Sequence, residues 1–405
     1  MHKFLSILRS RLPVLAGVAA VVLALLVGTH LRGSLCGAWQ MLHVPALSPL
    51  FADTRTITHA IDCFRSGQDP YTIAVRNFDP WHRDFYQPPI WLCLRYLGVT
   101  SRSTNIIGTL VAILTIAAFL LLFRAKTWPG AVIIFFAVTS RSVLFVVERG
   151  NMDQLIFSLM VFGFFLSERQ KPEVRSFLRA TLIVLLTVLK IFPIAAVVVL
   201  IRNRKGVITA LLTAVLSVAA LVATTGHHLS HILAVMEQSL WGSFGSLLFF
   251  EAIFTPTSRF LLALTQHHPK GVSLGALILA TLSVSAAVAW REKLARFLPP
   301  LDFNQARGSF AAAGLAIFCL AFLRGSSYDY RLIFLLGAIA YLVEDMNQGK
   351  SLRSLPAAIL LLALLWKPYQ LSLIFEILDG LVFVIACAWL GTSLLDNLCT
   401  IPVLD

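Results

Sequence analysis

The chain has 405 residues, of which 58% are hydrophobic and only 13% are charged, and its mean hydropathy is +0.82. Soluble domains carry roughly 25% charged residues, so the composition excludes a soluble enzyme, a disordered protein and a secreted disulfide scaffold. The 33 Lys and Arg outnumber the 20 Asp and Glu, for a net charge of +13, which indicates basic cytoplasmic loops rather than a nucleic-acid partner. We therefore expect an all-α polytopic membrane protein.

The first apolar run covers residues 12–31 and follows His2, Lys3, Arg9 and Arg11. A basic start before an apolar run is also typical of a signal peptide. This run is long enough to cross a bilayer, and no clear small-residue cleavage site follows it. We expect an uncleaved first span with its N-terminus in the cytoplasm.

Ten further apolar runs follow a long segment at residues 32–103. They are residues 104–123, 129–147, 154–166, 178–201, 206–225, 272–290, 309–323, 332–343, 356–366 and 371–390. The positive-inside rule places five basic clusters between these runs in the cytoplasm, at 124–126, 169–179, 202–205, 291–296 and 350–353. We expect one integral membrane domain over residues 1–405. It would have about 11 or 12 spans, with 32–103 as an outer loop, the remaining spans over 104–391 and a cytoplasmic tail at 392–405.

The run 178–201 has basic clusters at both ends, so it cannot be a single span if both clusters are cytoplasmic. Lys190 and Pro193 lie at its midpoint. Non-helical backbone is tolerated at membrane depth where it is buried in protein or lines a wet cavity. We expect a broken or hairpin pair with Lys190 at its outer tip, and re-entrant or interfacial segments at 88–99 and 246–264.

The segment 32–103 concentrates acidic residues, because five of the 20 in the chain lie between Asp53 and Asp84. Such a loop is either a site built on a membrane scaffold or simply solvated. Apolar residues at helical spacing predict a helix over 56–64, with Asp53 at or before its N-cap. Asp53 is therefore either a helix cap or a carboxylate able to accept a proton from a substrate hydroxyl, and the two roles are compatible.

Two further motifs of this loop have plain structural interpretations. Gly67, Asp69 and Tyr71 belong to a helix stop followed by a turn. Tyr86 precedes two prolines that set the start of an apolar segment. We therefore expect these residues to shape the loop or to contact the acceptor.

Charged residues beside apolar segments are costly unless they are paired or wet. If successive spans alternate between the two sides of the membrane, most of these charged residues fall on the outer face. They are Glu148, Arg149, Asp153, Lys190, Arg324, Asp329 and Arg331. Cations at a membrane boundary suit a phosphate such as a lipid headgroup, although structural ion pairs are the alternative for each residue.

Metal and nucleotide chemistry lack sequence support. The pairs His227/His228 and His267/His268 have no carboxylate partner at a recognised spacing, so we expect no metal. No nucleotide-binding motif is present, so we expect no cofactor. An activated substrate would then be carried by a lipid and approached from the bilayer or the outer side.

An ordered set of motifs resembles a known family. It comprises Asp53, then Gly67-x-Asp69-Pro70-Tyr71, Tyr86-x-Pro88-Pro89, Gly150-Asn151-Met152-Asp153 and Leu189-Lys190-x-x-Pro193. In order and spacing over residues 10–345 this set resembles glycosyltransferase family 87, the polyprenol-phosphate-mannose-dependent mannosyltransferases of the GT-C superfamily.

The resemblance implies a GT-C fold with juxtamembrane helices in a large first outer loop. It also implies a polyprenyl-phosphate sugar donor, usually mannose, and an inverting reaction. Asp53 matches the loop aspartate of the family and would be the general base. Lys190 matches the lysine of its Lys-x-x-Pro motif. Charge and expected side, not the resemblance, suggest Arg149 and Arg331 as further phosphate partners.

We therefore expect a hexosyl-transferring enzyme at the outer face of a bacterial inner membrane, with a glycolipid or polysaccharide acceptor and membrane lipids as partners. Asp62 is the alternative base. Asn151, Asp153 and Tyr330 are further candidates on the loop or acceptor side. The alternative function is a transporter or flippase of a lipid-linked or anionic envelope precursor, and a third is a non-catalytic subunit of an envelope pathway.

Overall fold

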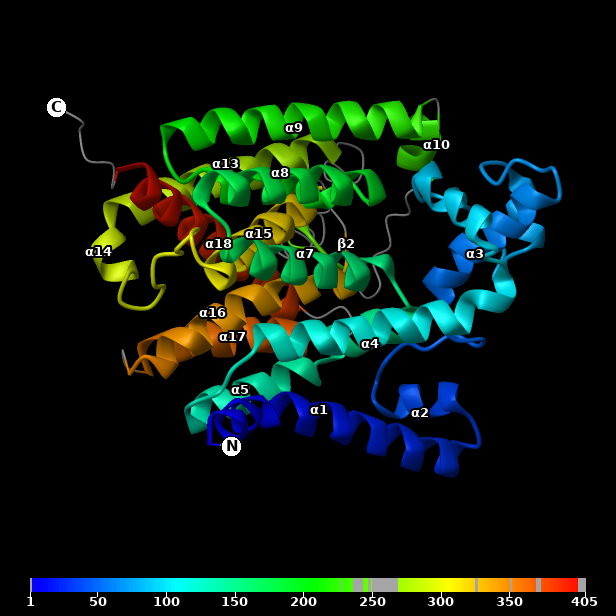
Figure 1. The fold of residues 1–405 in the computed structure, drawn as a ribbon, viewed down its shortest axis with the longest axis horizontal. Coiled ribbons are helices and arrows are strands. Elements are labelled where there is room, and N and C mark those ends of the chain that lie inside the picture. Colours follow the sequence, from blue (N-terminus) through cyan, green and yellow to red (C-terminus); the bar gives the residue numbers. More distant parts are fainter. Residues whose placement is uncertain are drawn as a thin grey trace.

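The computed structural model describes residues 2–226, 228–235, 243–246, 249, 269–324, 327–349, 352–368 and 373–399. Most of these residues form α-helices that run along the long axis of the molecule (Figure 1). Among the described residues the only strands are β1 (Ser243–Phe244) and β2 (Ser327–Tyr328), which pair antiparallel.

The elements up to residue 149 are α1 (His2–Arg32), α2 (Leu35–Met41), α3 (Ala52–Arg65), η1 (Ile73–Asn77), η2 (Pro89–Leu97), η3 (Ser101–Ser103), α4 (Thr104–Leu122), α5 (Trp128–Val138) and α6 (Arg141–Arg149). The remaining helices of the described residues are α7 (Met152–Glu168), α8 (Pro172–Leu189), η4 (Phe192–Leu200), α9 (Arg204–Thr225), α10 (His228–Val235), α13 (Pro269–Ala289), α14 (Arg291–Leu294), α15 (Ala306–Leu323), η5 (Asp329–Leu335), α16 (Leu336–Asn347), η6 (Leu352–Ser354), α17 (Leu355–Leu365) and α18 (Leu373–Cys399). The η segments are 3₁₀ helices.

Six helical stretches of the described residues are long and apolar enough to cross a membrane. They are Leu8–Arg32, Ser101–Leu122, Trp128–Arg149, Arg204–Thr225, Ala306–Leu323 and Ile374–Cys399. The chain is thus an all-α polytopic membrane protein. The shorter apolar helices are Gly275–Ala289 and Leu352–Leu365.

The described residues thus contain six candidate spans, whereas the expectation of 11 or 12 concerned the whole chain. Apolar sequence alone does not distinguish a full span from a half-length buried helix. The run 332–343 is divided between η5 and α16, and α8 carries Glu173, Arg175 and Arg179 in its first half. The expected segment 246–264 lies almost entirely outside the described residues.

The expected break in the run 178–201 is confirmed. α8 ends at Leu189, and Lys190 follows as its C-cap with extended backbone angles (φ −164°, ψ 138°). Pro193 then stands in the first turn of η4, where its missing N–H removes no helical hydrogen bond. Because η4 packs against α8, α9 and α15, the Lys190 junction is buried in protein.

The loop 32–103 forms a packed unit rather than an extended, solvated segment. Ile57 and Ile61 of α3, Phe85 and Trp91 form a buried cluster with Met152 of α7. Figure 1 shows α2, α3 and α10 at one end of the bundle, while α1 and α9 begin at the opposite end. We call that opposite end the basic end, because it carries the clusters 124–126, 169–179 and 202–205.

Within the segment 88–99, residues 89–97 fold as η2, and the re-entrant or interfacial placement of this segment stays a prediction. Trp91 donates its indole N–H to the carbonyl of Leu189 over 3.1 Å, which joins the loop to the end of α8. Tyr96 and Leu97, at the other end of η2, are exposed. This contact brings the loop close to the Lys190 junction.

Candidate active site

Asp53 lies one residue inside α3 and does not cap it. Phe51 is the N-cap, with a left-handed backbone (φ 59°), and makes no side-chain capping bond. The expectation that Asp53 would stand at or before the N-cap is therefore wrong, because Asp53 lies two residues after it. In the first turn its negative charge is still stabilised by the helix dipole, and its side chain is 12% exposed.

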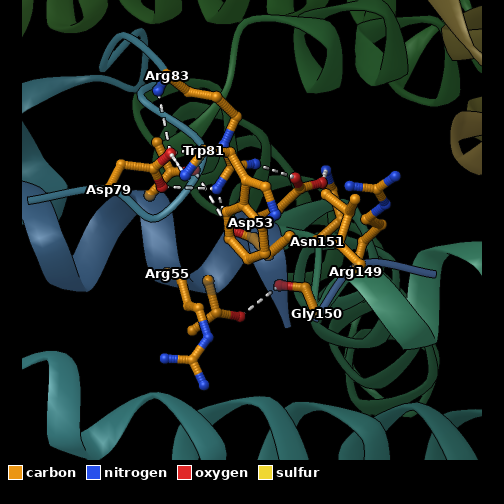
Figure 2. Close-up of polar contacts among 12 residues, drawn as sticks. Asp53, Arg55, Asp79, Trp81, Arg83, Arg149, Gly150 and Asn151 are labelled. Carbon is orange, nitrogen blue, oxygen red and sulfur yellow. Dashed lines mark hydrogen bonds and ion pairs between the residues drawn. The ribbon is translucent and has the colours of Figure 1, made fainter. Parts of the chain in front are cut away.

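Two side chains from opposite sides contact the Asp53 carboxylate (Figure 2). The amide nitrogen of Asn151 donates to Oδ2 over 2.6 Å. Arg83 lies 3.4 Å from Oδ1 through Nη1. Among the described residues Oδ1 has only this long contact, so its lone pairs are available to accept a proton.

Arg83 is itself oriented by Asp79. Its Nε and Nη2 donate to the two carboxylate oxygens of Asp79 over 3.1 and 2.9 Å, and Nη2 also donates to the Ala52 carbonyl over 2.7 Å. Its guanidinium lies 4.7 Å from the centre of the Trp81 ring. Figure 2 shows Arg83 between the two aspartates. The Arg83 guanidinium thus joins residues 79–83 to the start of α3.

The Asp79 side chain is only 1% exposed. Burial opposes its charged form, but hydrogen bonds from Arg83 and from the backbone N–H groups of Arg83 and Trp81 outweigh burial and lower the pKa of its carboxyl. Sequence reasoning did not select Asp79 or Arg83. The available signal was their opposite charges four residues apart in an acid-rich loop.

Asn151 connects Asp53 to a buried cluster of charges. It caps α7 by accepting from the backbone N–H of Asp153 over 2.8 Å. The same oxygen accepts from Lys190 Nζ over 3.2 Å. Lys190 pairs with Asp153 over 2.9 Å, and Arg331 Nε lies 3.5 Å from the same carboxylate oxygen. Two cations thus share one carboxylate, so the group keeps an excess positive charge.

Lys190 and Arg331 lie at the wall of a narrow pocket of about 40 Å³. Its lining is Tyr86, Gln87, Pro88, Lys190, Ile191, Phe192, Leu221, Thr225, Leu229, Ile232 and Arg331. The guanidinium of Arg331 lies 4.1 Å from the Phe192 ring centre. Burial and the nearby Asp53 carboxylate raise the pKa of Tyr86, so its phenol stays a neutral donor. The pocket therefore combines a cationic wall with an apolar remainder.

Arg149 does not line this pocket. Its Nη2 donates to the carbonyl of Pro45 over 3.0 Å, and its Nε lies 3.4 Å from Glu148. Glu148 in turn accepts from the backbone N–H of Leu47. The geometry places Arg149 in a contact that secures residues 45–47, not beside Lys190 and Arg331.

The other candidates of the loop make local contacts. Asp62 accepts from the backbone N–H of Ser101 over 3.0 Å, at the start of the α4 span. Gly67 has a positive φ of 82° at the end of α3. Asp69 accepts from the backbone N–H of Tyr71, whose hydroxyl donates to the carbonyl of Gln87. These contacts do not reach Asp53.

Tyr330 is buried beside the cations, with Lys190 Nζ 5.7 Å from its ring centre. Within the described residues, no group of three or more His, Cys, Asp or Glu could hold a metal ion. His228 stacks on Tyr71 at 3.9 Å between ring centres. His227, His267 and His268 lie outside the described residues.

The comparison with family models gives one result. The model of glycosyltransferase family 87 matches residues 86–303, more than half of the chain. The chain belongs to glycosyltransferase family 87. No curated protein and no solved structure matches it significantly.

This family 87 protein is a multi-pass membrane glycosyltransferase of the GT-C type, with a sugar donor and an acceptor as substrates. The matched region contains Asn151, Asp153 and Lys190, whereas Asp53 precedes it and Arg331 follows it. Family membership therefore supports the transferase, and the roles of the individual residues depend on geometry.

Proposed function

We propose that this glycosyltransferase moves a sugar, mannose as the first choice, from a polyprenyl-phosphate donor to a hydroxyl of a glycolipid or polysaccharide. The site would face the outer side of a bacterial inner membrane. Asp53 acts as general base, and Lys190 and Arg331 bind the donor phosphate. Family membership favours this function over a transporter or an assembly subunit.

The observation that carries the proposal is the double contact of Asn151. Its amide nitrogen binds Asp53 and its amide oxygen binds Lys190. One rigid helix cap therefore sets the base and the cationic wall of the pocket relative to each other. Such preorganisation is what transfer between two bound substrates requires. The apolar side chains Leu221 and Leu229 line the same pocket as the cations, and this combination matches the polarity of a phosphate attached to an isoprenoid chain.

The proposed step forms one bond and breaks one bond. The acceptor oxygen attacks the anomeric carbon from the face opposite the phosphate, so the anomeric centre inverts. Its proton passes to Asp53, where Oδ1 has the weaker existing contact. The bond from the anomeric carbon to the phosphate oxygen breaks, and polyprenyl phosphate leaves as an anion. No general acid is needed, because Lys190 and Arg331 stabilise the developing charge.

The test measures transfer by the purified protein in lipid. Labelled polyprenyl-phosphate mannose, galactose and arabinose are incubated with an envelope extract, and product and released polyprenyl phosphate are resolved. We expect Asp53→Asn to lower kcat by about 100-fold or more. The matched control is Asp84→Asn, because Asp84 belongs to the same loop but pairs with Arg76 near the surface.

Folding of each variant is verified by its thermal unfolding before rates are compared. A folded Asp53→Asn protein that transfers sugar at the wild-type rate would refute the assignment of the base. Saturable binding of the donors without any transfer would favour the transporter or flippase instead.

A further inference from the structure

Three arginines converge near the basic end of the bundle, far from the pocket at Lys190. Arg175 and Arg179 of α8 both reach the segment that precedes α15. Arg175 Nη1 donates to the Asn304 carbonyl over 3.1 Å, and Arg179 Nη1 donates to the Phe303 carbonyl over 2.8 Å. Arg202 stands two residues before α9, which begins at this end (Figure 1). Its positive charge is repelled by those of Arg175 and Arg179.

These guanidinium groups keep four buried nitrogen atoms without a hydrogen-bond partner in the described part of the chain. They are Arg175 Nε, Arg179 Nη2, Arg202 Nε and Arg202 Nη2. The whole Arg179 residue is 0% exposed. Its other nitrogens are satisfied by Ser167, Phe303 and Ser309.

The neighbouring carboxylates are engaged elsewhere. Glu168 accepts from the backbone N–H of Ala306 over 3.1 Å. Asp302 accepts from the backbone N–H of Asn304 and from the side chain of Gln305, each over 2.9 Å. Across the described ranges, no carboxylate lies within 4.0 Å of the three guanidinium groups in an ion pair. The cluster therefore keeps both positive charge and free donors.

Buried donors without partners are rare and destabilising in folded proteins. A guanidinium does not lose its proton, so these groups need an acceptor. Oxygen atoms of a phosphate match the planar donor fork of arginine and the positive charge together. The positive-inside rule accounts for exposed cations such as Arg204, but it gives no reason to bury Arg179.

We propose that Arg175, Arg179 and Arg202 form a binding site for a phosphoryl oxyanion at the basic end, separate from the proposed transfer site. The positive-inside rule places this end in the cytoplasm, where the membrane leaflet carries anionic lipids. The phosphate belongs either to the headgroup of such a lipid or to a free phosphate ion. Bound there, it links α8 to the segment before α15 and to the start of α9.

The test compares Arg202→Gln with Arg204→Gln in the full chain. Both remove one positive charge from the same short basic cluster, but Arg204 is exposed. Retention of phosphatidylglycerol over phosphatidylcholine is measured by native mass spectrometry. In a second arm, the unfolding temperature is measured with inorganic phosphate against chloride at equal ionic strength. Arg175→Gln serves as a second variant if Arg202→Gln does not fold.

We expect Arg202→Gln to weaken binding by about tenfold, the effect of losing a charged hydrogen-bond donor, and Arg204→Gln to bind like the wild type. Selective loss of phosphatidylglycerol identifies a lipid headgroup. Selective loss of the shift by inorganic phosphate identifies the free ion. Equal weakening by both substitutions, or no binding in either arm, would overturn the proposal. Sugar transfer is not the readout, so the result is independent of the proposed function.

Discussion

The ion pair between Asp79 and Arg83 allows a quantitative prediction about the loop that carries Asp53. Asp79 accepts four hydrogen bonds, two from the Arg83 side chain and two from the backbone N–H groups of Trp81 and Arg83. The substitution Asp79→Asn removes the negative charge of the carboxylate. It also places an amide N–H against N–H donors of Arg83 and Trp81, at a position where no acceptor remains for them. Breaking a buried ion pair costs about 3–5 kcal/mol when one charge stays buried.

The effect here should fall below that range. Arg83 keeps its bond to the Ala52 carbonyl, and its side chain is 25% exposed. We therefore expect a loss of about 2.7 kcal/mol in the local stability of residues 79–86, which corresponds to about a 100-fold rise in the open population. Hydrogen exchange at the Trp81 and Arg83 amides reports this population directly, because both donate to Asp79.

The matched control is Asp84→Asn in the same loop. Asp84 pairs with Arg76 near the surface, and such pairs contribute little. Exchange at residues 79–86 should therefore stay within about threefold of the wild type. Equal exchange rates in the Asp79→Asn and Asp84→Asn proteins would refute the reasoning that the ion pair between Asp79 and Arg83 organises this loop.

Three further predictions concern the same region. Because the pKa of Asp79 is lowered in the fold, its stabilising contribution is present above the unfolded pKa of about 3.9 and is lost as pH falls through the lower folded value. The protection factor of the Trp81 amide, which compares its exchange with the intrinsic rate at the same pH, should therefore fall only below about pH 4. Gly150→Ala should lower the unfolding temperature more than Gly67→Ala, because both have positive φ but only at Gly150 would a Cβ meet Thr54 Oγ1, at 2.5 Å. Asp153→Asn should weaken donor binding, measured as a higher KM in the transfer assay, because it removes the anion that orients Lys190 and Arg331.

Several features could be predicted from local sequence because their causes are local. A composition of 58% hydrophobic and 13% charged residues leaves a membrane as the only suitable solvent. Lys190 and Pro193 interrupt an apolar run, and the helix breaks there because proline cannot continue it. The family resemblance likewise rested on ordered motifs, and the match over residues 86–303 confirms the family.

The number of spans is harder to predict because an apolar run has the same composition at the lipid boundary and in a protein core. α15 counts as a span, yet most of it is buried inside the protein. The shorter run 332–343 is just as apolar but divides into η5 and α16. Burial by neighbouring helices decides these cases, and no single run contains that information.

The sequence by itself determined the membrane class, the break at Lys190 and the concentration of charge in the first loop. Only the tertiary structure decided which charges meet. Asp53 contacts Asn151 across 98 positions of sequence, and Lys190 reaches Asn151 across 39. Arg149 carries the same charge as Lys190 and precedes Gly150, but it donates to the carbonyl of Pro45 instead. Charge and spacing specify which groups seek partners, but the packing of distant helices selects the partner, because a buried polar group takes whichever acceptor the fold brings within hydrogen-bond distance.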